Sequence, residues 1–87
     1  MDRGKARVEF VVSNDRDQPV TLIIEPWAEE FPMRPKTEAS VVCETFDVTI
    51  PVFVQVTDDY IILNDIGDDV CVRYDGRERV VGEVDRP

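Results

Sequence analysis

The side chains that could carry out chemistry gather mainly in one acidic and aromatic segment. Its members are Glu25, Trp27, Glu29, Glu30, Phe31 and Met33. Paired carboxylates hydrolyse glycosidic bonds when they stand roughly 5–9.5 Å apart and one of them has a raised pKa. Adjacent glutamates on an exposed loop of a small domain lack the burial that raises a pKa. We therefore interpret these carboxylates as solvated charge.

The chain contains no histidine, which removes much nucleophilic and metal chemistry. Serine–histidine and cysteine–histidine systems need an imidazole base, and a blue-copper site needs two histidines beside its cysteine. Of the two serines, Ser13 and Ser40, neither lies in a Gly-x-Ser-x-Gly elbow. We therefore expect no catalytic residues and a protein that is not an enzyme.

The cysteines and the turn aspartates do not predict a metal site. Two cysteines without histidine cannot complete a structural zinc site, so we expect Cys43 and Cys71 to be free thiols, with Cys43 pointing inward and Cys71 on the opposite face. Calcium takes ~6–8 oxygen ligands, and the aspartates lack the spacing of an EF-hand loop. We expect no metal and no cofactor, and interpret as turn formers Asp58, Asp59, Asp65, Asp68 and Asp69.

The aromatic segment has two readings. Aromatic side chains on a loop held by prolines can anchor a partner or stack on a sugar, which gives as candidate binding residues Trp27, Glu29, Glu30, Phe31 and Met33. The alternative is that Trp27 and Phe31 fold back and cover one open end of the core, because a small domain gains much from burying an aromatic ring. Exposure of Trp27 distinguishes the two readings.

The charge balance narrows the classes of partner. The formal net charge is −9, from 19 acidic and 10 basic residues. Nucleic-acid binding needs a basic surface to displace counterions from phosphate, and an anionic membrane surface needs one for the same reason. The N-terminal residues include no apolar signal core and the chain has no 18-residue apolar run. We expect a cytoplasmic protein that binds neither nucleic acid nor membrane.

Composition predicts that strands position these side chains. Valine and isoleucine total 21 against 5 for leucine and alanine together, and β-branched residues favour strands over helices. Period-two alternation predicts seven strands over residues 7–13, 20–25, 38–46, 48–57, 60–64, 69–74 and 77–82. Asp75-Gly76 predicts a two-residue hairpin turn. Residues 26–36 carry three prolines and predict a long ordered loop, with one helical turn near Ala28.

These elements predict one all-β domain over residues 1–87, with residues 1–5 and 83–87 as loose ends. The expected architecture is a single antiparallel β-sandwich, or a small partly open barrel, whose C-terminal half is a meander of hairpins. Alternation predicts a core that includes Val8, Phe10, Val12, Leu22, Ile24, Val41, Val54, Val56, Ile62 and Val72.

The order of motifs from Asn14 to Val42 resembles a group of small bacterial all-β proteins whose function is uncharacterised. The shared pattern is a strand, the loop Glu25-Pro26-Trp27, an acidic-aromatic pair, a proline turn and another strand, and the strands and Asp-Gly hairpin of residues 60–80 follow it. The resemblance implies a cupredoxin- or immunoglobulin-like sandwich without the metal. Ala28 and Lys36 stand where the group usually has glycine.

Edge strands give a prediction about self-association, because their unpaired backbone groups can pair with a second chain. The 48–57 strand carries Pro51 and little charge, and Phe53 falls on its otherwise polar face. Val11 and Ile23 fall on the outer faces of their strands. We expect a homodimer that buries Phe53 with one or both of these residues, unless residues 27–33 cover the patch within one chain.

Taken together, the sequence favours a small non-enzymatic protein-interaction or structural module with an unidentified protein partner. The alternative is a domain that binds a small ligand or a carbohydrate with the segment Trp27–Met33.

Overall fold

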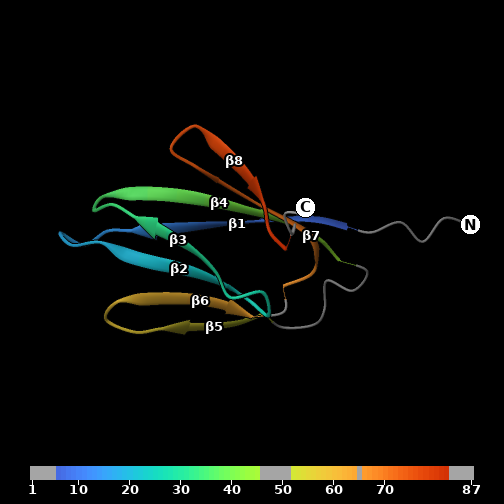
Figure 1. Ribbon diagram of the computed structural model, residues 1–87, viewed down its shortest axis with the longest axis horizontal. Helices are drawn as coiled ribbons and strands as arrows, with labels where there is room; N and C mark the ends of the chain where they lie inside the picture. Colours follow the sequence, from blue (N-terminus) through green and yellow to red (C-terminus); the bar gives the residue numbers. More distant parts are fainter. Residues whose placement is uncertain (1–5, 46–51, 65, 83–87) are drawn as a thin grey trace, which may run out of the picture.

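A computed structural model describes residues 6–45, 52–64 and 66–82 and shows two four-stranded sheets packed face to face (Figure 1). The protein is therefore an all-β sandwich. Its strands are β1 (Ala6–Asn14), β2 (Val20–Glu25), β3 (Glu29–Met33), β4 (Thr37–Thr45), β5 (Phe53–Val56), β6 (Tyr60–Asn64), β7 (Asp68–Tyr74) and β8 (Arg77–Val80).

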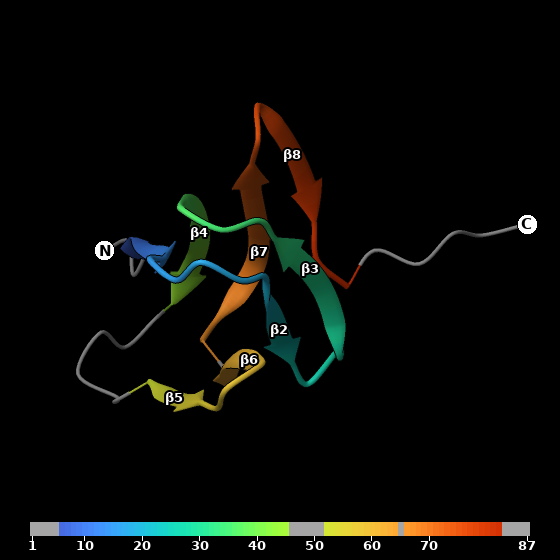
Figure 2. The same ribbon diagram turned by 90° about the vertical axis from the view of Figure 1, so that its left-hand side faces the viewer.

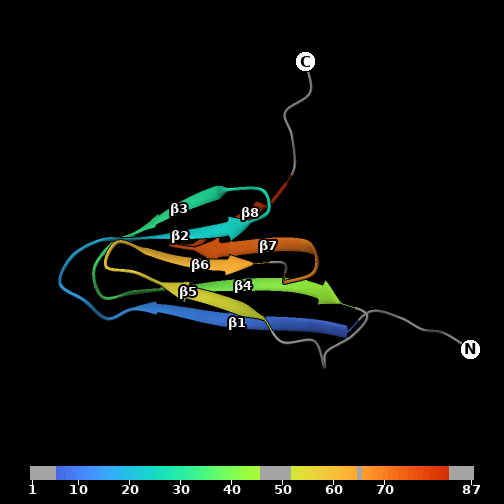
Figure 3. The ribbon, with the colours of Figure 1, turned by 90° about the horizontal axis from the view of Figure 1, so that it is seen from below.

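The two sheets have the strand orders β1-β4-β7-β8 and β3-β2-β6-β5. All neighbouring pairs are antiparallel except β2 and β6, which run parallel from Thr21↔Tyr60 to Glu25↔Asn64. Viewed along the strands, the sheets form two layers, with β8 and β3 on one flank and β1 and β5 on the other (Figures 2 and 3). Each flank therefore brings together the edge strands of both sheets.

Alternation of side chains builds the core between the layers. In β2 the odd-numbered Thr21, Ile23 and Glu25 are half-buried, while the even-numbered residues are fully buried. This is the pattern of a strand with one face against a second sheet. The core cluster consists of Val12, Val20, Leu22, Ile24, Phe31, Met33, Ala39, Val41, Cys43, Leu63, Ile66, Val70, Val72 and Val81.

The predicted loop over residues 26–36 is wrong, because it contains β3. Residues 26–28 form a tight turn instead of a helical turn, and Ala28 has a φ of 57°. Thr21 N–H donates to Asp59 O on the far side of β2, so the backbone of Pro32, which pairs with Thr21, faces the free edge. There a missing N–H breaks no ladder bond, and proline is tolerated.

The C-terminal half forms two hairpins, as expected, but they lie in different sheets. The β5–β6 hairpin belongs to the sheet of β2, whereas β7–β8 belongs to the sheet of β4. The chain therefore crosses between the layers after β6 and is not one continuous meander. The Asp75-Gly76 turn is confirmed, with positive φ angles of 57° and 75° that a primed turn requires. Of the predicted 48–57 strand, residues 48–51 lie outside the described part.

Three predicted core residues are wrong. Val54 and Val56 pair with Leu63 and Ile61 and share their inward face, but they are 52% and 65% exposed. The reason is that β5 is an edge strand and no other described strand covers this part of the flank. Ile62 is only half-buried because it occupies the outer face, while its neighbour Leu63 is buried.

A buried asparagine joins the turns at one end of the sandwich. Asn14 is 2% exposed, and its amide nitrogen lies 3.0, 3.3 and 3.1 Å from the carbonyl oxygens of Gln18, Met33 and Arg34. Its Oδ1 accepts a hydrogen bond from the backbone N–H of Arg16 at 3.2 Å. The β1–β2 turn is thus fixed to the end of β3 by one side chain.

Candidate functional site

The structure divides the predicted binding segment between the core and the surface. Phe31 and Met33 are buried at 8% and 0% exposure, so they are core residues of β3 and not loop residues. Glu29 points inward beside Phe31 and is half-buried, whereas Glu30 is exposed on the outer face. The five side chains therefore do not converge on one binding surface.

Trp27 partly covers one end of the sandwich. Its ring lies so close to Gly82, just after β8, that a Cβ on that glycine would stand 2.6 Å from the indole Nε1. The side chain remains 40% exposed. Trp27 thus bridges the β2–β3 turn to the end of β8 while one side of the ring stays open to solvent. Its position lies between the two interpretations of the sequence, a side chain that covers the core and a side chain exposed for binding.

The free edge of β5 is the most apolar strand edge on the molecule's described part. Phe53, Val54 and Val56 are 71%, 52% and 65% exposed. Thr57 N–H donates to Tyr60 O at 2.8 Å, and backbone groups alternate in direction along an antiparallel strand. The N–H and C=O groups of Val54 and Val56 therefore face away from β6, where no described strand pairs with them.

The other three sheet edges carry features that discourage strand pairing. Strand β1 presents Arg7 and Glu9, strand β3 has Glu30 and Pro32, and β8 reads Arg-Glu-Arg-Val. Charges and prolines on edge strands are the usual protection against unwanted pairing. Strand β5, with the sequence Phe-Val-Gln-Val, has no charge and no proline. Among the described edges it alone lacks this protection.

The residues of the predicted dimer patch do not lie on one face. Phe53 and Ile23 both occupy the outer face of the β3-β2-β6-β5 sheet, on either side of β6, where Ile23 pairs with Ile62 and Phe53 with Asn64. Val11 lies on the outer face of the other sheet and is 63% exposed. A single contact surface can therefore include Phe53 with Ile23, but Val11 belongs to the opposite side of the sandwich.

On the opposite flank, a groove of about 410 Å³ runs between β3 and β8. We call it the β3–β8 groove; its lining includes Phe31, Pro32, Val72, Tyr74, Arg77 and Arg79. The Arg79 guanidinium pairs with Glu29 Oε2 at 3.1 Å and lies 5.2 Å from the centre of the Phe31 ring. This pair joins the two sheets across the flank. Sequence reasoning missed the groove, because it treated β8 only as a hairpin strand.

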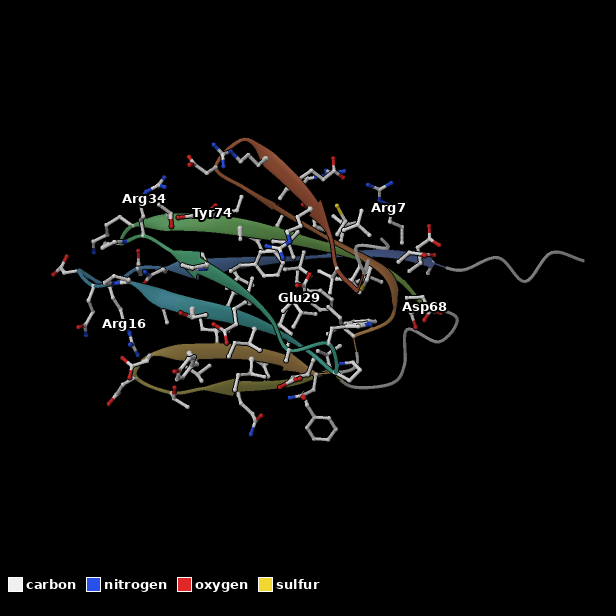
Figure 4. All side chains as sticks on the ribbon, in the orientation of Figure 1. Arg7, Arg16, Glu29, Arg34, Asp68 and Tyr74 are labelled. Atoms are coloured by element: carbon white, nitrogen blue, oxygen red, sulfur yellow. The ribbon has the colours of Figure 1, made fainter. Side chains whose placement is uncertain are left out.

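A second cluster that the sequence did not reveal surrounds Tyr74 (Figure 4). The Tyr74 hydroxyl accepts a hydrogen bond from the backbone N–H of Arg34 at 2.8 Å, and the Arg34 guanidinium pairs with Asp75 at 3.1 Å. The hydrogen bond from Arg34 and its positive charge lower the pKa of Asp75, and Arg77 adds a smaller effect of the same sign. These contacts fix the β3–β4 turn to the β7–β8 hairpin.

Both cysteines are free thiols, as the sequence predicts. Cys43 is buried and Cys71 is half-buried on the outer face, where its Sγ lies 2.8 Å from Glu78 Oε2. Burial raises the pKa of the Cys43 thiol. Burial, followed by the hydrogen bond to Glu78, raises the pKa of the Cys71 thiol. A thiol with a raised pKa is a poor nucleophile at neutral pH.

Residues 6–45, 52–64 and 66–82 contain no group of three or more cysteine, aspartate or glutamate side chains placed to hold a metal ion. The same residues form no helix with the length and apolar character of a membrane span. Asp65, which the sequence places among the turn aspartates, lies outside the described residues.

Comparison with known proteins finds no match to the chain among protein-family models, curated proteins or solved structures. The resemblance around Glu25-Pro26-Trp27 therefore stays a prediction. A functional proposal has to rest on the geometry of this chain.

Proposed function

We propose that the protein is a small non-enzymatic interaction module that associates through the free edge of β5, with a second copy of the same chain as its partner. The observation that carries the proposal is the contrast between the four sheet edges. Three edges carry charge or proline, whereas β5 offers unpaired backbone groups beside exposed Phe53, Val54 and Val56.

Strand addition at an edge supplies main-chain hydrogen bonds and buries the side chains beside them. Two β5 strands related by a two-fold axis would pair antiparallel and extend the sheet across the dimer, since a two-fold interface uses the same surface on both copies. The uncharged Phe-Val-Gln-Val sequence brings no like charges opposite one another in such a ladder. The net charge of −9 on each chain opposes association, so the contact is mainly apolar and tightens with added salt.

Light scattering after size-exclusion chromatography tests the proposal with two matched variants. Val56→Lys places a charge on the β5 edge, and Val11→Lys places the same charge on the other sheet at almost the same exposure, 65% against 63%. We expect the wild-type chain and Val11→Lys to dimerise and Val56→Lys to stay monomeric. Equal behaviour of the two variants would remove β5 as the interface.

A further inference from the structure

The charged side chains around the β3–β8 groove divide into two groups by strand register. Arg77 and Arg79 pair with Tyr74 and Val72 and therefore occupy the inward face of β8. Glu30 and Glu78 occupy outward positions, and Glu78 lies close to Arg73 and Cys71 on the outer face. Both glutamates border the groove, and Glu29 lies beside it in its ion pair with Arg79.

One of the two inward arginines, Arg77, has no close acidic partner among the described residues and interacts with Asp75 only through a weaker charge effect. Arg79 is neutralised by Glu29, whose side chain is only 22% exposed. Arg77 makes no hydrogen bond or ion pair within the described part of the chain. Acidic residues outnumber basic residues by 19 to 10, so an unpaired arginine at a concave surface is unusual here. Its guanidinium therefore borders the groove without an ion-pair partner of its own in the part that the structure describes.

The floor of the groove is apolar. Phe31 and Val72 are buried beneath it, with 8% and 2% exposure, and Pro32 and Tyr74 add apolar surface at its sides. The volume of about 410 Å³ falls at the lower end of the ~300–1,000 Å³ range of small-molecule sites. Such sites combine an apolar lining with a few polar groups that fix the orientation of the ligand.

We propose that the β3–β8 groove binds a small organic carboxylate with an apolar body. The body packs against Phe31, Val72 and Tyr74, and the carboxylate accepts two parallel hydrogen bonds from the planar guanidinium of Arg77, the geometry in which arginine binds carboxylates most strongly. Arg79, held in place by Glu29 and Phe31, lies beside the same position, with its charge offset by Glu29. The site lies on the flank opposite β5 and does not depend on the proposed dimer.

A titration with 3-phenylpropionate at pH 7 and low salt tests the proposal, with 3-phenylpropionamide as the uncharged probe of the same shape. Backbone amide shifts in ¹H–¹⁵N spectra report where each probe binds. We expect saturable shifts in β3, β7 and β8 at millimolar concentrations, and affinity for the amide lower by about tenfold, the factor that 1.4 kcal/mol represents. If these shifts do not saturate up to ~20 mM of probe, the binding free energy is weaker than about 2.3 kcal/mol and the proposed site is overturned. Equal affinity for the two probes would also overturn it.

Two variants with the same change in net charge test the role of Arg77. Arg77→Gln removes the inward guanidinium, whereas Arg73→Gln removes one from the outer face of the neighbouring strand. We expect the first variant to weaken carboxylate binding about tenfold and the second to change it less than about twofold. Equal losses of affinity in the two variants would mean that the carboxylate responds only to the overall charge of the protein, and would overturn the proposal. Arg77→Lys keeps the charge but lacks the planar guanidinium, and should bind the carboxylate with intermediate affinity. The same spectra report whether each variant is folded.

Discussion

Replacing Asn14 with alanine removes the side chain that ties one end of the sandwich together. The amide nitrogen donates hydrogen bonds to three carbonyl oxygens at 3.0–3.3 Å, and Oδ1 accepts a hydrogen bond from one backbone N–H. A buried hydrogen bond contributes about 0.5–1.5 kcal/mol net, and a carbonyl left without a partner costs more. We therefore expect Asn14→Ala to lower the free energy of unfolding by about 3 kcal/mol, which corresponds to ~12–24 °C in Tm for a domain of this size.

Urea unfolding followed by circular dichroism measures the change, with Asn64→Ala as the control. Within the described residues, the Asn64 side chain makes one exposed hydrogen bond, to Gln55 at 3.3 Å, so its loss should cost less than about 1 kcal/mol. Asn14→Asp should be as destabilising as Asn14→Ala at neutral pH, because a carboxylate would face three carbonyl oxygens. Acidification should recover part of that loss, since the protonated acid donates again. A cost for Asn14→Ala no larger than that for Asn64→Ala would refute the account of this end of the fold.

Two backbone predictions follow from positive φ angles. Ala28 has a φ of 57°, so Ala28→Gly should relieve a strain of about 1–2 kcal/mol at some entropic cost and raise Tm by a few degrees. The control Ala39→Gly, in the buried part of β4, should lower Tm. A loss of stability in Ala28→Gly would contradict the prediction. Gly82→Ala should destabilise by about 1–3 kcal/mol and change the fluorescence of Trp27, because its Cβ meets the indole. Gly76 has a similar φ, but a Cβ at this position would have no atom within 4 Å. Gly76→Ala should therefore lose only the stability that the strained backbone costs, with the Trp27 fluorescence unchanged.

Alternation in the sequence was enough to predict most strands. Strands β2 and β6 have the predicted bounds, β1 is one residue longer at each end, and β4 and β7 begin one residue earlier, while the predicted last residue of the 38–46 strand lies outside the described part. It failed for β3, where Pro26 and Pro32 suggested a loop. The inward sequence Glu29, Phe31 and Met33 was visible, but the tolerance for Pro32 depends on its facing a free edge. That is a property of strand order, which local pattern does not contain.

The sites were harder to predict for the same reason. Alternation placed Val54 and Val56 on the inward face, but only the strand order shows that no other described strand covers this part of the flank. The β3–β8 groove joins side chains more than 40 positions apart in the chain, such as Phe31 and Arg77. The alternating Arg-Glu-Arg pattern of residues 77–79 was a signal, because arginines on the inward face of a strand require an explanation.

The central claim, association through the β5 edge, is tested most directly by the molar mass in solution. Light scattering at micromolar and higher concentrations, at low and high salt, distinguishes a 10.0 kDa monomer from a dimer of twice that mass. The account predicts a dimer whose population rises with salt, because salt screens the charge of −9 on each chain and leaves the apolar contact intact. A mass near 10 kDa at every concentration and at both salt levels would contradict it.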